Sequence, residues 1–178
     1  MRIISGNFKG RRFQAPDNLP ARPTTDAAKE SLFNILGNHL EWEDLNVLDL
    51  FAGIGSISLE FVSRGAAEVH AVDSHRGCVK FIEGMAQKWG MDNLHVFKQD
   101  AFEYLKKSRF SYNLVFADPP YQLENIARIP DIVLGSDCLV QDGFLVLEHS
   151  GKYHFGQDPR CIEERRYGKV HFSFFRKI

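Results

Sequence analysis

The segment with the clearest chemical potential is Asp118-Pro119-Pro120-Tyr121, which follows an apolar run at 112–117. Two consecutive prolines fix the backbone and remove two amide donors, so the segment presents acceptors, the Asp118 carboxylate and the Pro119 carbonyl. Such acceptors can hold both N–H groups of a nucleobase amine and align its nitrogen with a methyl donor. The Tyr121 ring offers a surface on which the base can stack. We predict that these four residues form the catalytic group; the alternative is a strand that simply ends at prolines.

A second set of residues suits a nucleoside cofactor. The apolar run 46–51 leads into Gly53 and Gly55, whose spacing permits a tight turn and close approach of a ligand to the backbone. Asp73 ends the next apolar run, where a carboxylate of a doubly wound sheet accepts hydrogen bonds from ribose hydroxyls. Asp100 follows the third run, and we expect it to cap the helix that starts at Ala101; the same carboxylate can also accept a hydrogen bond from an adenine amine.

The residues around this turn favour S-adenosylmethionine over a dinucleotide. A dinucleotide fingerprint requires a third glycine where Ser58 stands, and the pyrophosphate would lie close to Asp49. S-adenosylmethionine has an amino-acid end and no phosphate, which removes the conflict with Asp49. We expect the cofactor to contact residues that follow the apolar runs, namely Asp49, Leu50, Phe51, Ala52, Gly53, Gly55, Asp73, Ser74, Asp100 and Ala101.

The elements that must position these residues alternate along the chain, which is typical of a parallel sheet with right-handed crossovers. Strands are predicted at 46–51, 68–73, 94–98, 112–117 and 143–148, and helices at 56–64, 75–89, 101–107 and about 130–137. Residues 161–175 are expected to form an antiparallel hairpin at the edge of the sheet. The N-terminal residues 1–15 are predicted to form a further β-hairpin. A proline-containing linker follows, and then a helix from Thr25 or Asp26 to about Asn38.

Charge is concentrated at the two ends of the chain, although the net charge is only −1. Residues 1–22 contain five basic residues and one acidic residue. Residues 160–178 contain six basic and two acidic residues. This asymmetry suggests a polyanionic partner, while solvated chain ends would explain it equally well. Phe8 and Phe13 among the N-terminal cations favour nucleic acid. We predict an RNA-binding extension at 1–25 and a methyltransferase domain at 26–178.

Composition excludes several classes of protein. The chain has 178 residues, of which 44% are hydrophobic and 25% charged, as expected for a folded α/β protein. Cys78, Cys138 and Cys161 lie far apart, which supports neither a disulfide framework nor a zinc ribbon and fits a reducing compartment. No two of the seven histidines have metal-ligand spacing, so no metal is expected. No signal peptide and no apolar run of the ~18–20 residues of a membrane helix can be read, so we expect a cytoplasmic protein without a membrane partner.

The segments MRIISGNFKGRRFQAP, RPTTDAAKESLFNIL and DLFAGIGSISLEFVSRGA, followed by AVD and DPPY, resemble the RsmD family of small-subunit ribosomal RNA guanine-N2 methyltransferases. The resemblance runs from Met1 to about Glu148 and departs from the family at Ile54, where a small residue is frequent. It implies a Rossmann-like class I fold, S-adenosylmethionine as cofactor, and Asp118 to Tyr121 around the target amine.

The same resemblance implies ribosomal RNA, or a partly assembled small subunit, as the partner. It also implies that the N-terminal hairpin contacts RNA and that Arg22, Pro23 and Thr24 lie near the active site. The residues expected to contact RNA are Arg2, Lys9, Arg11, Arg12, Arg22 and Thr24.

Three other functions stay open at this point. A DNA or RNA adenine-N6 methyltransferase could use the same acceptors, although 178 residues leave little room for a separate DNA-reading domain. A nucleotide-dependent dehydrogenase is disfavoured by Ser58 and by the Asp118 segment. A non-catalytic RNA-binding module would not need that segment intact.

Overall fold

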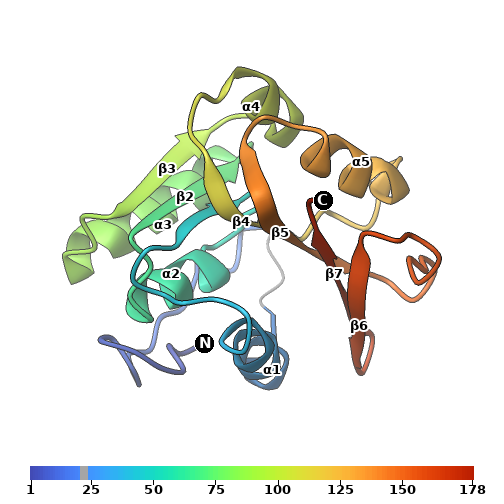
Figure 1. Ribbon diagram of the computed structural model, residues 1–178. Helices are drawn as coiled ribbons and strands as arrows, with labels where there is room; N and C mark the ends of the chain where they lie inside the picture. Colours follow the sequence, from blue (N-terminus) through green and yellow to red (C-terminus); the bar gives the residue numbers. More distant parts are fainter. Residues whose placement is uncertain (21–23) are drawn as a thin grey trace.

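The apolar runs of the sequence form neighbouring strands of one sheet, in the order β3-β2-β1-β4-β5-β7-β6 (Figure 1). The computed structural model describes residues 1–20 and 24–178. The strands are β1 (Asn46–Asp49), β2 (Glu68–Asp73), β3 (Leu94–Lys98), β4 (Tyr112–Ala117), β5 (Leu139–His149), β6 (Cys161–Tyr167) and β7 (Val170–Arg176). The helices are α1 (Asp26–Leu36), α2 (Ser56–Ser63), α3 (Arg76–Trp89), α4 (Ala101–Lys107) and α5 (Ile129–Leu134), with a 3-10 turn η1 (Ile126–Arg128) before α5.

Strands β1 to β5 pair in parallel, and β7 pairs antiparallel with both β5 and β6. The predicted fold class, a mostly parallel Rossmann-like sheet with an antiparallel C-terminal hairpin, is therefore confirmed. None of the helices in the described part of the chain is long and apolar enough to cross a membrane.

Both faces of the sheet are covered by helices. Val47 and Leu114 pack with α1, α2 and α3 on one face, whereas the next residues, Leu48 and Val115, pack with α4 and α5 on the other. This alternation follows from the two-residue period of a strand. It explains why β1 and β4 read as continuous apolar runs and not as alternating ones.

Element boundaries differ from the predicted ones in several places. Strand β1 ends at Asp49 instead of residue 51, because the chain turns there towards Gly53. Helix α1 ends at Leu36, and α5 spans Ile129–Leu134 instead of 130–137. Strand β5 is longer than predicted and begins at Leu139, with a register irregularity where it pairs with β4.

The predicted N-terminal β-hairpin is present in short form, with an antiparallel bridge between Arg2 and Arg12. The Ile3 amide donates to the Arg11 carbonyl at 2.9 Å, and the Phe13 amide donates to the Met1 carbonyl at 3.2 Å. The hairpin is also bonded to helix α2, because the amides of Ile4 and Ser5 donate to the Glu60 carboxylate at 2.9 and 3.0 Å. Side-chain burial also differs from that of a free extension, because Ile3 and Phe13 belong to the hydrophobic core.

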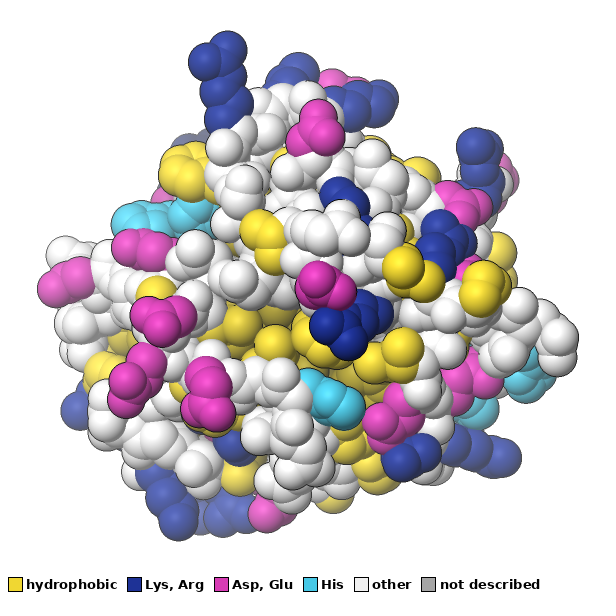
Figure 2. All heavy atoms as spheres, in the orientation of Figure 1, with side chains coloured by type: hydrophobic (Ala, Val, Ile, Leu, Met, Phe, Trp, Pro, Cys, Tyr) yellow, Lys and Arg dark blue, Asp and Glu magenta, His cyan; other side chains and the backbone are white. Residues whose placement is uncertain are grey.

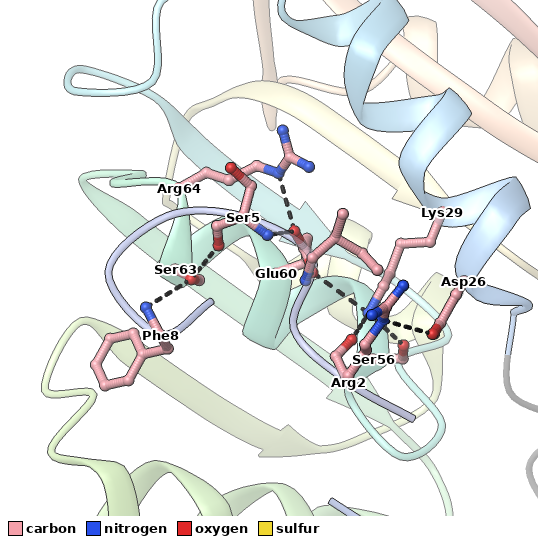
Figure 3. A network of polar contacts seen from close by, with 10 residues as sticks. Arg2, Ser5, Phe8, Asp26, Lys29, Ser56, Glu60, Ser63 and Arg64 are labelled. Carbon is pink, nitrogen blue, oxygen red and sulfur yellow. Dashed lines mark hydrogen bonds and ion pairs between the residues drawn. The ribbon is translucent and has the colours of Figure 1, made fainter. Parts of the chain in front are cut away.

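Glu60 is the centre of a buried polar network that the sequence did not reveal (Figure 3). Its carboxylate lies 3.3 Å from the Lys29 ammonium and 3.0 Å from the Arg64 Nε, and the Glu60 and Lys29 side chains are fully buried. Burial lowers the pKa of Lys29, and the charge of Glu60 opposes this shift. The Lys29 Nζ also donates to the carbonyl of Arg2 at 2.7 Å, which ties α1 to the N-terminal segment.

Ser63, one turn further along α2, holds the next part of the N-terminal segment (Figure 3). Its Oγ accepts from the Phe8 amide at 3.0 Å, and its carbonyl accepts from the Asn7 amide at 2.7 Å. Gly6 lies so close to this carbonyl that an added Cβ would stand 1.7 Å from the oxygen, and its φ is +82°. Only glycine can occupy this position without displacing the segment from α2.

We expect Glu60→Ala to destabilise the protein by about 3–5 kcal/mol, because it leaves the Lys29 charge buried without a partner. The double variant Glu60→Gln/Lys29→Met should recover most of this loss, since glutamine keeps an acceptor for the two amides and methionine carries no charge. Urea denaturation measures both values, with Glu30→Gln on the exposed side of α1 as the control. A loss for Glu60→Ala no larger than that of the control would contradict this account of the network.

Candidate active site

The predicted cofactor turn after β1 is fastened to the end of β2 by Asp73. Its Oδ2 accepts from the Gly53 amide at 2.8 Å, and its Oδ1 accepts from the His75 amide at 2.7 Å. A carboxylate has about four acceptor sites, so Asp73 retains capacity for ribose hydroxyls. Gly55 precedes α2 with a φ of +77°, and a Cβ there would lie 2.8 Å from a side-chain carbon of Ile82. Glycine is therefore required at position 55, because a side chain would clash with Ile82 and strain the backbone.

Asp49 is buried beneath this turn. The Ser58 hydroxyl donates to its Oδ2 at 2.6 Å, while its Oδ1 has no hydrogen-bond partner among the described residues. Burial, followed by the charges of Asp118 and Asp73, raises the pKa of Asp49 to about 7. Ser58, which the sequence showed only as a missing glycine, thus has a positive role in holding the carboxyl group.

Asp100 follows β3 at the same edge of the sheet and caps helix α4. Its Oδ1 accepts from the amides of Phe102 and Glu103, both at 3.0 Å, so the predicted capping role is confirmed. Ala101 is the buried first residue of α4, and Ser74 is exposed beside Asp73. The predicted cofactor residues therefore follow the carboxyl ends of three neighbouring strands, where ligands bind in open α/β sheets.

The Asp118 segment lies next to this turn, because β4 is the neighbour of β1. Burial raises the pKa of Asp118 to about 7. Pro119 is buried, Pro120 is exposed, and the Tyr121 side chain is 49% exposed, as a ring that stacks on an incoming base needs to be. The candidate site thus combines the predicted cofactor turn with a set of acceptors at the switch point of the sheet.

Glu148 belongs to the same site, although we did not predict it. Ala117 is the register partner of Leu147, so the next residues, Asp118 and Glu148, stand side by side at the ends of β4 and β5. Glu148 is buried, and its Oε2 has no hydrogen-bond partner in the described part of the chain. Burial, and then the charge of Asp118, raises the pKa of Glu148 to about 9. The sequence feature that could have identified Glu148 is its position at the end of the apolar run 143–148.

These carboxyl groups fit a cationic nucleoside better than an anionic one. Asp49, Asp73, Asp118 and Glu148 lie around one end of the sheet. Burial disfavours the ionised forms of Asp49, Asp118 and Glu148, and repulsion by the charge of Asp118 adds to this for Asp49 and Glu148. A ligand with positive charge would relieve that repulsion, whereas a pyrophosphate would increase it. The arrangement agrees with the predicted choice of S-adenosylmethionine.

Two of the predicted RNA contacts are engaged within the protein. The Arg2 guanidinium pairs with Asp26 at 3.0 Å on the surface. The Arg11 guanidinium lies 4.8 Å from the centre of the Phe8 ring and 5.6 Å from that of Trp89. Such stacking positions the Arg11 side chain without neutralising its charge.

The other predicted RNA contacts are placed as follows. Lys9 and Arg12 are exposed, and Thr24 is partly exposed just before α1. Arg22 and Pro23 lie outside the described residues. Figure 2 shows Lys and Arg side chains spread around one face of the molecule with acidic side chains between them, and no single basic patch dominates that face. RNA contact by these residues stays a prediction.

The fold and the site define the class of this protein. It is similar to a solved hypothetical protein of Thermus thermophilus with a TM-score of 0.84 and 24% identity, covering 98% of each chain. It is also similar in fold to an RNA methyltransferase from Salinibacter ruber in complex with S-adenosyl-L-homocysteine, with a TM-score of 0.67, 14% identity, and coverage of 87% and 93%. The protein is a Rossmann-like, S-adenosylmethionine-dependent methyltransferase.

The family is equally clear. The family model described as Conserved hypothetical protein 95 matches residues 1–176, so the chain belongs to this family, and the predicted relationship to RsmD is confirmed. The ribosomal RNA small subunit methyltransferase D of Escherichia coli K12 is 30% identical over 148 residues, 83% of this chain and 74% of the relative. The protein of the same name from Buchnera aphidicola (subsp. Baizongia pistaciae) is 25% identical over 182 residues, 100% of this chain and 92% of the relative.

We expect the free energy of unfolding to fall as the pH rises from about 5 towards 9. Glu148 has a raised pKa in the folded state, so its stabilising contribution is fully present below the unfolded pKa and is lost as the pH rises through about 9. Each such proton contributes a slope of at most about 1.4 kcal/mol per pH unit. Urea denaturation between pH 5 and 9 should show a shallower slope for Glu148→Gln than for the wild type. The exposed Glu124→Gln serves as control, and an unchanged slope in Glu148→Gln would show that Glu148 is not the group responsible.

Proposed function

We propose that this protein transfers a methyl group from S-adenosylmethionine to the exocyclic N2 amine of a guanine in small-subunit ribosomal RNA. The observation that carries the proposal is the placement of the Asp118 acceptors beside the turn that Asp73 closes. The names of the relatives, ribosomal RNA small subunit methyltransferase D, support the choice of RNA. Such a substrate is found in the cytoplasm, in agreement with the expected location.

The side chains of the site have distinct tasks in this reaction. When bound, S-adenosylmethionine supplies an electrophilic methyl group on a sulfonium. Asp118 and the Pro119 carbonyl accept the two N–H groups of the guanine amine, which directs the nitrogen lone pair towards the methyl group. Tyr121 stacks on the base after it has left its helix or loop. Forming the N–C bond would break the bond between the methyl carbon and the sulfonium sulfur, leaving S-adenosylhomocysteine, and the extra proton on the nitrogen would pass to Asp118 in its carboxylate form.

Glu148 favours guanine over adenine. With a raised pKa it is a neutral acid at pH 7, so it offers one carbonyl acceptor and one hydroxyl donor beside the Asp118 segment. Guanine with N2 at Asp118 presents N1–H and O6 to such a group, and both can be paired. Adenine with N6 at Asp118 presents the N1 acceptor followed by C2–H, which leaves one Glu148 oxygen unpaired. An unpaired buried polar group costs about 1–3 kcal/mol.

The decisive test is the identity of the methylated nucleoside. The enzyme is incubated with S-adenosylmethionine and, in separate reactions, with unmodified small subunits, free ribosomal RNA or duplex DNA, and the nucleic acid is digested for mass spectrometry. We expect N2-methylguanosine from the RNA substrates and little methylation of the DNA. Partly assembled subunits should be methylated at least as well as free RNA, because the base must be exposed. N6-methyladenine as the main product, or a clear preference for DNA, would overturn the proposal.

Asp118→Ala should reduce turnover by at least about 100-fold, because it removes a group that acts in the transition state. Binding of S-adenosylhomocysteine, measured by calorimetry, should change by no more than a few fold, since Asp118 is assigned to the target amine. Normal turnover in the variant would remove Asp118 from the catalytic group. Strongly weakened binding of S-adenosylhomocysteine would assign it to the cofactor instead.

The double variant Lys9→Ala/Arg12→Ala should weaken RNA binding and flatten its salt dependence. For single-stranded RNA, the slope of log K against log salt should shrink by about 0.7 for each lost phosphate contact. Lys106→Ala/Lys107→Ala on α4 is a matched control, because these exposed lysines pair with Glu103. Equal slopes for the wild type and the N-terminal variant would mean that the N-terminal charges are merely solvated.

A further inference from the structure

A cluster of potential metal ligands lies at the amino-terminal end of β2 and β3, opposite the active-site edge of the sheet. Glu68 and His70 are two residues apart on β2, so they share one face of the strand. His70 is the register partner of His95 on β3. The three residues can each offer one ligand atom such that all the atoms lie within 4.8 Å of one another. Figure 2 shows histidine (cyan) beside acidic side chains (magenta) at the left of the molecule, on the side of β2 and β3.

The His70 ring is held by partners that leave one nitrogen for a ligand. Its Nδ1 lies 2.7 Å from the Tyr112 hydroxyl and 3.1 Å from the Tyr104 hydroxyl. The two hydroxyls lie 2.7 Å from each other, so Nδ1–H can donate into a chain of hydroxyl groups. In that tautomer Nε2 carries a free lone pair. Metal-binding histidines have the same arrangement, in which the second ring nitrogen donates to an outer hydrogen-bond partner that fixes the ring.

The other two residues can adjust to an ion. The His95 Nε2 lies 2.8 Å from the Glu68 Oε2, and the two side chains are 47% and 51% exposed. Small rotations of these half-exposed side chains would exchange their mutual contact for contacts to an ion between them. They line an open pocket of about 360 Å³, whose walls include Phe97 and Phe110. This volume has room for an ion together with a water molecule or a small ligand.

We propose that Glu68, His70 and His95 bind one divalent transition-metal ion, of which zinc is the best match. Two imidazoles and one carboxylate form a known zinc donor set, which leaves a fourth tetrahedral position for water or substrate. Calcium and magnesium prefer sites made entirely of oxygen ligands, so this set selects against them. The site is separate from methyl transfer, because it lies at the end of the sheet opposite Asp118.

Titration calorimetry of the metal-stripped full-length protein with zinc chloride tests the site. We expect one ion per chain, with no saturable binding of magnesium or calcium. Cobalt(II) should give the intense visible absorption of a tetrahedral site. His95→Ala and Glu68→Gln should each weaken zinc binding by at least about tenfold. Loss of a group that only orients a ligand already costs about that much, and loss of a ligand itself should cost no less. Circular dichroism would verify that both variants fold, as expected for exposed residues.

Two matched controls make the assignment specific. His154→Ala removes an exposed histidine elsewhere on the surface, and Cys161→Ser removes a partly buried thiol. Both should bind zinc like the wild type. The proposal fails if zinc binding is not saturable, if His95→Ala and Glu68→Gln bind with the affinity of the wild type, or if either control loses as much affinity as they do.

Discussion

The arrangement of the N-terminal half depends on the pairing of the buried Glu60 carboxylate with its surrounding donors. Removing a carboxylate and an ammonium from water is costly, so both must be paired and fully hydrogen-bonded in the folded state. Glu60 meets this requirement with Lys29 of α1, Arg64, and the amides of Ile4 and Ser5. Because α2 starts at the cofactor turn, the same helix that shapes the active site also orders the first residues of the chain. The N-terminal cations therefore have a defined position relative to the site.

The active-site edge depends on a different electrostatic balance. Parallel pairing of β1, β4 and β5 brings Asp49, Asp118 and Glu148 to one end of the sheet, where burial and mutual repulsion raise their pKa values. This costs the protein stability at neutral and alkaline pH, since the carboxyl groups hold protons that an unfolded chain would release. A cationic cofactor and an amine-bearing base are ligands that such an edge can favour. Stability and function therefore oppose each other at these residues.

The two ends of the sheet carry chemistry of different kinds. At the carboxyl end, loops with glycine and proline bring backbone groups and carboxylates together in the candidate active site. At the amino end of β2 and β3, side chains on adjacent strands come together without a loop, as Glu68, His70 and His95 do. The tyrosine hydroxyls of α4 and β4 that hold His70 show how the helix layer contributes to this second cluster.

The sequence alone determined those features that depend on local spacing. Apolar runs, the Gly53–Gly55 turn with Asp73, and the rigid Asp118-Pro119-Pro120-Tyr121 segment predict the fold class and the class of enzyme, because strand period, turn sterics and proline geometry act within a few residues. Only the tertiary structure decided which strands are neighbours and in what register. That choice brought Glu148 beside Asp118, paired His70 with His95, and closed Lys29 onto Glu60 across thirty-one positions of sequence. It also bonded the predicted N-terminal hairpin to α2, because the buried Glu60 carboxylate requires donors and the Ile4 and Ser5 amides supply them.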